Sequence, residues 1–160
     1  MAEKSTQHNF RNFDLNKTLV TNLDNGIIIL NSDLIIYHFN NWLELHTSLK
    51  EKDLLGKNIV DVFPNIKKKT LKRKINTALN MGTQTFYTAS TSKYLIPIKI
   101  NQIKISSFDH MRQDVNIIPI DSEEKLVALI ISDQTNITNI HHLLELNLKK
   151  FLKSSIVSDK

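Results

Sequence analysis

The chain has 160 residues and a formal net charge of +5, a length that suits one folded domain with its own core. It contains no cysteine, which excludes a disulfide framework, thiolate metal sites, thiol catalysis and a cysteinyl cofactor adduct. No apolar run approaches the roughly 18 residues that a membrane span needs. The polar N-terminal residues also lack the apolar stretch of a secretory signal. We therefore expect a cytoplasmic protein without membrane insertion.

The N-terminal part predicts a helix followed by a β-hairpin. Residues 1–14 are polar and are expected to form a flexible lead before a short helix over 15–23. Residues 26–30 and 34–39 are two runs rich in β-branched and aromatic residues, and they are typical of strands. Residues 31–33 separate them with turn-forming side chains. The two strands are therefore expected to pair.

Short helices and then one long helix are expected after the hairpin. Asn41 and Glu44 have the spacing of a capping box, in which the carboxylate reaches back to a free amide of the first turn. A second short helix is expected to end at Gly56, because glycine tolerates the left-handed backbone that follows helices. Residues 66–81 have the periodicity of an amphipathic helix, which stops at Gly82.

Much of the positive charge falls on this long helix, where a nucleic-acid footprint and a solvated face are the two interpretations. The basic residues are Lys67, Lys68, Lys69, Lys72, Arg73 and Lys74. The apolar stripe of the helix consists of Leu71, Ile75, Ala78 and Leu79. Because most of the later basic residues lie off this stripe, we favour the solvated face and predict no nucleic-acid partner.

The C-terminal half is expected to be mostly strand. The candidate strands cover residues 84–89, 94–100, 115–120 and 126–132. Pro97 places the second of these at a sheet edge or a bulge, because proline has no amide hydrogen to donate. A helix is expected over residues 136–153, with a tail over 154–160. Helices clustered beside an antiparallel sheet are typical of the α+β class.

Short motifs in the correct order resemble the PAS family over about residues 15–135. They are the hairpin 26–39, Asn40, Asp53-Leu54-Leu55-Gly56-Lys57, Asp61-Val62-Phe63-Pro64, Gly82 and Asp133-Gln134-Thr135. Two further segments resemble bacterial sensor segments that precede diguanylate cyclase or histidine kinase modules. These segments are Lys93-Tyr94-Leu95-Ile96-Pro97 and the residues from Gln113 to Pro119.

The resemblance implies a PAS-like fold, with a five-stranded antiparallel sheet, helices over one face, and flanking helices at both ends. It also implies that ligands lie between the sheet and the helices, and that a separate kinase, cyclase or chemotaxis protein supplies the output. The chain departs from the cyclase-linked relatives because it ends at Lys160 without an output domain. We expect either an excised fragment or a stand-alone sensor.

Resemblance and periodicity together predict the residues that border the ligand space. They are Ile28, Tyr37, Trp42, Ile59, Ile75, Leu79 and Phe86. Asp133 and Thr135 are expected to form the signal junction, since a carboxylate and a hydroxyl there can cap the terminal helix.

The terminal helix has two interpretations. Ile137, Ile140, Leu144 and Phe151 follow an a/d pattern, with Asn147 at a d position. A short coiled coil has this pattern, and so does an amphipathic helix that folds back on its own sheet. We favour a homodimer that pairs through Ile137, Ile140 and Leu144.

We favour the absence of a cofactor, and the identity of any cofactor stays unknown. Haem-binding relatives commonly carry the axial histidine on the long helix, where this chain has none, so His38 and His46 are the candidates that remain. The absence of cysteine excludes a flavin photoadduct, whereas non-covalent flavin stacked on Trp42 stays open. His141 and His142 are adjacent and do not make the i, i+4 pair that favours metal binding, so no metal site is expected.

Catalysis has little support in the sequence, which lacks a Gly-x-Ser-x-Gly elbow and a glycine-rich phosphate loop. We therefore predict a non-enzymatic sensory signal-transduction module that binds a small ligand or a partner. Two alternatives stay open, namely a ligand-free dimerisation domain and a small enzyme with a cone-shaped α+β fold.

Overall fold

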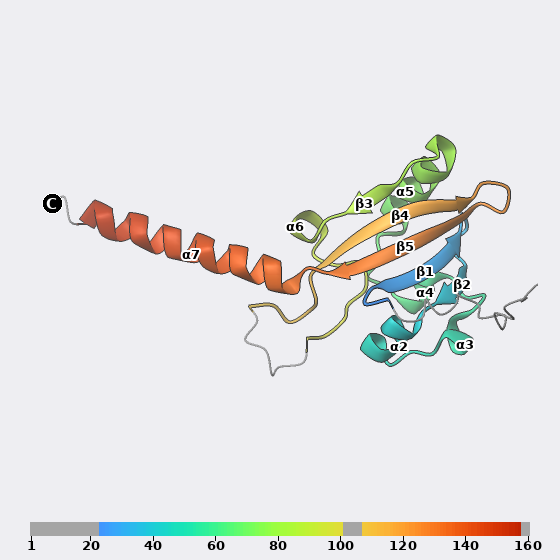
Figure 1. The fold of residues 1–160 in the computed structure, drawn as a ribbon, viewed down its shortest axis with the longest axis horizontal. Coiled ribbons are helices and arrows are strands. Elements are labelled where there is room, and N and C mark those ends of the chain that lie inside the picture. The colour runs from blue at the N-terminus through green and yellow to red at the C-terminus, as the bar shows by residue number, and fades with distance from the viewer. Residues whose placement is uncertain (1–22, 101–106, 158–160) are drawn as a thin grey trace, which may run out of the picture.

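A five-stranded antiparallel sheet forms the centre of the molecule, in the order β2-β1-β5-β4-β3 (Figure 1). The computed structural model describes residues 23–100 and 107–157, with side chains described up to residue 153. The strands are β1 (Gly26–Asn31), β2 (Ile36–Phe39), β3 (Thr85–Tyr87), β4 (Gln113–Asp121) and β5 (Leu126–Asp133). This arrangement confirms the expected α+β fold.

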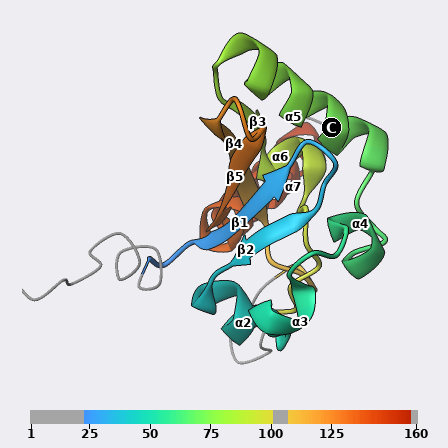
Figure 2. The same cartoon turned by 90° about the vertical axis from the view of Figure 1, so that its right-hand side faces the viewer.

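Four helices gather on one side of the sheet, and the last helix leaves it (Figures 1 and 2). The helices are α2 (Asn41–Thr47), α3 (Glu51–Leu54), α4 (Ile59–Val62), α5 (Lys68–Met81), α6 (Ala89–Ser92) and α7 (Thr135–Val157). Helices α2 to α5 connect β2 to β3 and cover one face. Helix α7 follows β5 directly and extends away from the sheet along the long axis of the molecule (Figure 1).

The core lies between the sheet and its covering helices because side chains alternate along each strand. Ile28 of β1 pairs with Leu129 of β5, which in turn pairs with Ile117 of β4, so these three side chains share the inner face. Each of them is completely buried. Leu71 and Ile75 of α5 are also fully buried and pack into the same cluster. Burial of each such side chain stabilises the fold by about 1.5–3 kcal/mol.

Helix α2 approaches β1 closely at Gly26. A Cβ atom at this position would lie 2.7 Å from Cδ2 of Leu43 and 3.1 Å from Cε3 of Trp42. Only glycine therefore lets these two α2 side chains pack directly on the strand backbone. The contact sets the position of α2 at the end of the sheet.

Several elements differ from the sequence-based expectation. Residues 94–100 do not form a strand. Lys99 makes one isolated bridge with His110, and the backbone N–H of Leu95 donates to the side chain of Gln113 instead of to a strand. The expected strand over 84–89 is shorter, because α6 begins at Ala89. Helix α7 begins one residue before the expected helix and continues to Val157. The expected lead over 1–14 and most of the helix over 15–23 lie outside the described residues.

Candidate ligand groove and signal junction

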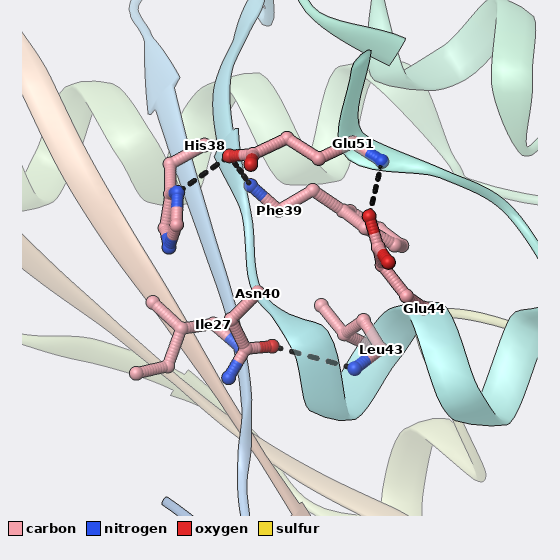
Figure 3. Close-up of polar contacts among 7 residues, drawn as sticks. All are labelled: Ile27, His38, Phe39, Asn40, Leu43, Glu44 and Glu51. Carbon is pink, nitrogen blue, oxygen red and sulfur yellow. Dashed lines mark hydrogen bonds and ion pairs between the residues drawn. The ribbon is translucent and has the colours of Figure 1, made fainter. Parts of the chain in front are cut away.

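Asn40 ties β1 to the beginning of α2 (Figure 3). Its Oδ1 accepts hydrogen bonds from the backbone N–H groups of Ile27 at 3.0 Å and Leu43 at 3.4 Å. Its Nδ2 donates to the carbonyl of Asn25 at 2.9 Å. The Asn40 side chain is buried, and its one amide both caps the helix and supplies an acceptor for a backbone N–H of the strand. The residue that caps α2 is therefore Asn40, one residue before the expected Asn41.

A chain of carboxylates joins β2, α3 and α2 next to this amide (Figure 3). Oε1 of Glu51 accepts from Nδ1 of His38 at 2.6 Å and from the backbone N–H of Phe39 at 3.1 Å. Glu44 accepts from Nζ of Lys50 at 2.9 Å and from the backbone N–H of Glu51 at 2.7 Å. The bond from Lys50 and the bond from the Glu51 amide lower the pKa of Glu44 below its usual value.

Five of the seven residues expected around the ligand space lie between the sheet and the helices. Ile28, Ile59 and Ile75 are completely buried there. Trp42 and Leu79 are partly buried and pack against the same cluster. The five side chains therefore belong to one continuous apolar interior, while their contact with a ligand stays a prediction.

Tyr37 is a correction, because it points to solvent and is 56% exposed. The pairing of β1 with β2 shifts between Ile29 and Leu30, so Ile36 and Phe39 both face the core. Tyr37 falls in the bulge between them. A prediction that assumes regular alternation of side chains along the strand cannot reveal such a bulge. Each one-residue shift in register moves the following side chains to the opposite face of the sheet.

Phe86 is the second correction, because it is 57% exposed on the outer face of the sheet. It pairs with Asn116 of β4, whereas its neighbour Tyr87 pairs with the buried Val115. Tyr87 is therefore the aromatic residue of β3 that packs against the core. Burial raises the pKa of Tyr87 to about 12, although Arg73 opposes the shift. The phenol thus stays neutral at physiological pH.

A groove of about 540 Å³ opens between α3, α4 and the beginning of β2. Its walls include the apolar side chains of Ile35, Leu49, Leu54 and Val62, with polar residues such as Asn58 at the same groove. Leu54 belongs to the core cluster, and Leu49 and Val62 pack against it. The groove therefore connects to the apolar interior, and its volume lies within the range of small-molecule sites.

The beginning of α7 is bound to the strands by a set of short hydrogen bonds. Oδ1 of Asp133 accepts from the backbone N–H of Thr135 at 2.8 Å. Oγ1 of Thr135, which is buried, accepts from the backbone N–H of Arg112 at 2.9 Å. The carbonyl of Arg112 accepts from the N–H of Gln134 at 2.7 Å. The end of β5, the residue before β4 and the first turn of α7 therefore form one connected unit. We call it the signal junction, defined by Arg112, Asp133, Gln134 and Thr135.

Gln113 is a residue of this region that the sequence analysis did not recognise as a site. Its side chain is completely buried and accepts from the N–H groups of Leu95 at 3.0 Å and Ile96 at 3.1 Å. Its Nε2 donates to the carbonyl of Ile96 at 2.7 Å. The N–H of Gln113 also donates to the carbonyl of Lys93 at 2.9 Å. The two segments that resemble bacterial sensors are therefore bound to each other. The sequence signal that could have indicated Gln113 is a polar residue at the beginning of an apolar strand.

Helix α7 contacts its own domain through Asn139 and His142. The N–H of Ser107 donates to Oδ1 of Asn139 at 3.1 Å, and the rings of Phe108 and His142 lie 5.9 Å apart. All of these contacts involve the first two turns of the helix. Beyond them, the exposed apolar side chains of α7 include Leu144, Leu148 and Phe151.

The histidines considered as haem ligands make other contacts. His38 is bound to Glu51 on the edge strand β2, and His46 is exposed, with its ring stacked on Trp42 at 3.9 Å. Across residues 23–100 and 107–153, no three potential ligand side chains are grouped so that they could hold a metal ion. In the part of the chain that the structure describes, no helix has both the length and the hydropathy to cross a membrane.

Comparison with known proteins identifies the family. A family model described as the PAS fold matches residues 14–87. The structure of a sensory box sensor histidine kinase from Vibrio cholerae is 30% identical in sequence, with 74% of this chain and 88% of that chain covered at a TM-score of 0.53. The chain belongs to the PAS family.

Two further solved structures share the fold at low identity. The PAS domain of nitrogen regulation protein NR(II) from Vibrio parahaemolyticus is 14% identical, with a TM-score of 0.52 over 74% of this chain and 97% of that chain. The photoactive yellow protein domain of the sensor histidine kinase Ppr from Rhodospirillum centenum is 9% identical, with a TM-score of 0.50 over 72% and 91% of the two chains. Among curated proteins, no match is found.

The family model covers the first hairpin, helices α2 to α5 and β3. The groove between α3 and α4 therefore lies within the part of this PAS domain that the family model describes. The signal junction and α7 lie beyond residue 87 and outside that match.

Proposed function

We propose that this PAS domain is a sensory module that binds a small ligand and passes the signal through α7 to a partner subunit. In this proposal, residues 15–135 form the sensor, and the residues from 136 onward form the signalling helix. The observation that carries it is the signal junction, in which Thr135 joins the first turn of α7 to the backbone before β4 at 2.9 Å. A shift of the sheet would be transmitted directly to the helix.

The exposed seam of α7 supports pairing between two copies. With about 100° per residue, Asn139 and His142 lie on the side of the helix opposite Ile137, Ile140 and Leu144. The first two contact the domain, whereas the other three are exposed apolar residues. Because exposed apolar rows on helices favour association, a second copy of α7 is the proposed cover.

The groove between α3 and α4 supports binding of a largely apolar small molecule. Its apolar walls reach the core cluster through Leu54, so a ligand bound there would also approach the interior at Ile59. The proposed contacts are the interior residues Ile28, Trp42, Ile59, Ile75 and Leu79 together with the groove residues Ile35, Leu49 and Val62. A sensor histidine kinase is the favoured output, because the V. cholerae relative is described as one.

Sedimentation analysis of the full chain tests the relay surface. We expect a dimer for the wild type and a monomer for Leu144→Lys, because the substitution places a charge in the apolar seam. Leu146→Lys is the matched control, since Leu146 is also exposed but lies on the side of Asn139. A monomeric wild type, or equal loss of the dimer in both variants, would show that α7 does not pair through this seam.

A ligand-free interaction domain is the second candidate, and the complete burial of Ile28, Ile59 and Ile75 favours it. Mass spectrometry of the denatured protein separates the two candidates. A ligand-binding sensor should release a stoichiometric small molecule that is lost in Val62→Trp, where the larger side chain fills the groove. If the wild type carries none, and added extract supplies none, the dimerisation domain is the better description.

A further inference from the structure

A second pocket, of about 220 Å³, lies at the base of α7 and far in sequence from the ligand groove. It is formed by the residues after α6 and the residues before β4, including Lys93, Tyr94, His110 and Arg112. The segment before β4 is close to the first turns of α7, as the contacts of Ser107 and Phe108 with that helix show. The pocket therefore adjoins the signal junction.

The pocket is rich in hydrogen-bond donors and has excess positive charge. Lys93 and Arg112 are two cations, whereas Asp109 is the one carboxylate that lines it. Within the described residues, neither cation forms an ion pair with a carboxylate. The Nε of Arg112 is buried and has no acceptor in that part of the structure. A buried guanidinium N–H without an acceptor is costly, so an oxygen supplied by a bound ligand would satisfy the Nε of Arg112.

Hydrogen bonds fix the backbone at both cationic residues, and the Arg112 guanidinium also packs on an aromatic ring. Arg112 is bound on its N–H by Thr135 and on its carbonyl by Gln134, and its guanidinium carbon lies 4.0 Å from the centre of the Phe108 ring. The backbone of Lys93 has φ 58° and ψ −67°, a strained conformation for a residue with a Cβ. It is held by the bond between the Lys93 carbonyl and the N–H of Gln113.

We propose that this pocket binds a small oxyanion, a carboxylate or a phosphate, between Lys93 and Arg112. The planar guanidinium matches two oxygens of either group, and the lysine ammonium adds a point charge. The rings of Tyr94 and His110, whose centres are 5.2 Å apart, line the same pocket and can supply an O–H and an N–H donor. A volume of about 220 Å³ corresponds to roughly seven water molecules, which suits phosphate or a short dicarboxylate.

Binding here would act on the junction directly. The pocket wall and α7 are connected through Thr135, through Asn139 and through His142. An anion that orders Arg112 would therefore strengthen the contacts that hold the first turns of the helix. This input is separate from the proposed apolar ligand of the groove, because the two sites share no residue.

An NMR titration of the full chain tests the site with two probes, sodium phosphate and sodium malonate, each at constant ionic strength maintained with sodium chloride. We expect saturable shifts of the amides of Arg112, Gln134 and Thr135 with at least one probe. Arg112→Gln and Lys93→Gln should each weaken the apparent affinity by about tenfold or more. Lys69→Gln is the control, because it removes the same charge from an exposed position on α5.

Saturation by phosphate alone or malonate alone would support the site and name the class of its ligand. Lys93→Gln keeps the proposal testable even if Arg112→Gln unfolds, since Lys93 is exposed and makes no ion pair within the described residues. Shifts that do not saturate, or an affinity that Lys69→Gln reduces as much as Lys93→Gln does, would overturn the proposal. Unchanged affinity in both pocket variants would overturn it as well.

Discussion

The side-chain amide of Gln113 pairs with the backbone of Ile96 in both directions, donating to its carbonyl at 2.7 Å and accepting from its N–H at 3.1 Å. The amide thus takes the place of a neighbouring strand for a segment that contains Pro97. Both residues are completely buried, so no solvent can replace these bonds. This pairing holds the walls of the pocket at the base of α7 in place.

Gln113→Ala should destabilise the domain by about 2–4 kcal/mol, because it leaves the N–H groups of Leu95 and Ile96 buried without an acceptor. Urea unfolding followed by circular dichroism measures this change. Gln84→Ala is the control, since Gln84 is exposed, and its effect should stay within about 0.5 kcal/mol. Equal effects of the two substitutions would contradict the structural role of Gln113.

Thr135→Val should cost about 1–2 kcal/mol, because it removes the oxygen that accepts from the Arg112 N–H while preserving the shape of the side chain. Thr135→Ser keeps the hydroxyl and should recover most of the loss. Denaturant unfolding and hydrogen exchange at the Arg112 amide report the two effects separately. Faster exchange at Arg112 in the valine variant but not in the serine variant is the expected pattern; the same exchange in both would argue against the bond.

Acidification should weaken the tie between α2 and α3 through Glu44. Its pKa is lowered in the folded state, so the charged carboxylate stabilises the fold above the usual glutamate pKa of about 4.3. This contribution is lost as the pH falls through the lowered value. Glu44→Gln should therefore be less stable than the wild type at pH 7, and the difference should shrink as the pH falls towards about 3.

Melting curves over this pH range measure the effect, with Glu145→Gln as the control. Glu145 is exposed on α7 and makes no hydrogen bond or ion pair within the described residues. Its substitution should leave the pH dependence of stability close to that of the wild type. A Glu44→Gln variant whose deficit does not change with pH would exclude the charge of Glu44 as the cause.

The two faces of the sheet should respond differently to truncation. Ile75→Ala should cost about 2–5 kcal/mol, because Ile75 is completely buried between α5 and the sheet. Phe86→Ala should cost less than about 1 kcal/mol, since its ring is mostly exposed on the opposite face. Denaturant unfolding of both variants compares them, and a similar large loss for each would mean that Phe86 is also part of the core.

The order and type of most elements could be predicted from the sequence because their signals are local. The hairpin over residues 26–39 follows from two β-branched runs and a turn, and α5 follows from the spacing of Leu71 and Ile75. The end of α5 at Gly82 follows from the tolerance of glycine for the left-handed backbone, which Gly82 adopts with φ 60°. The Asp133-Gln134-Thr135 motif likewise marks the end of β5 by residues that are adjacent in the chain.

The tertiary structure decided which side of the sheet each residue faces and which distant residues meet. A bulge turns Tyr37 outward, and the register of β3 with β4 places Tyr87 in the core in place of Phe86. Lys93 and Arg112 line one pocket because a buried side chain, Gln113, binds the backbone of a segment 17 residues away. Such pairings depend on strand register, which decides which residues meet, and on burial, which sets the cost of an unpaired polar group. Neither is encoded by periodicity along the chain.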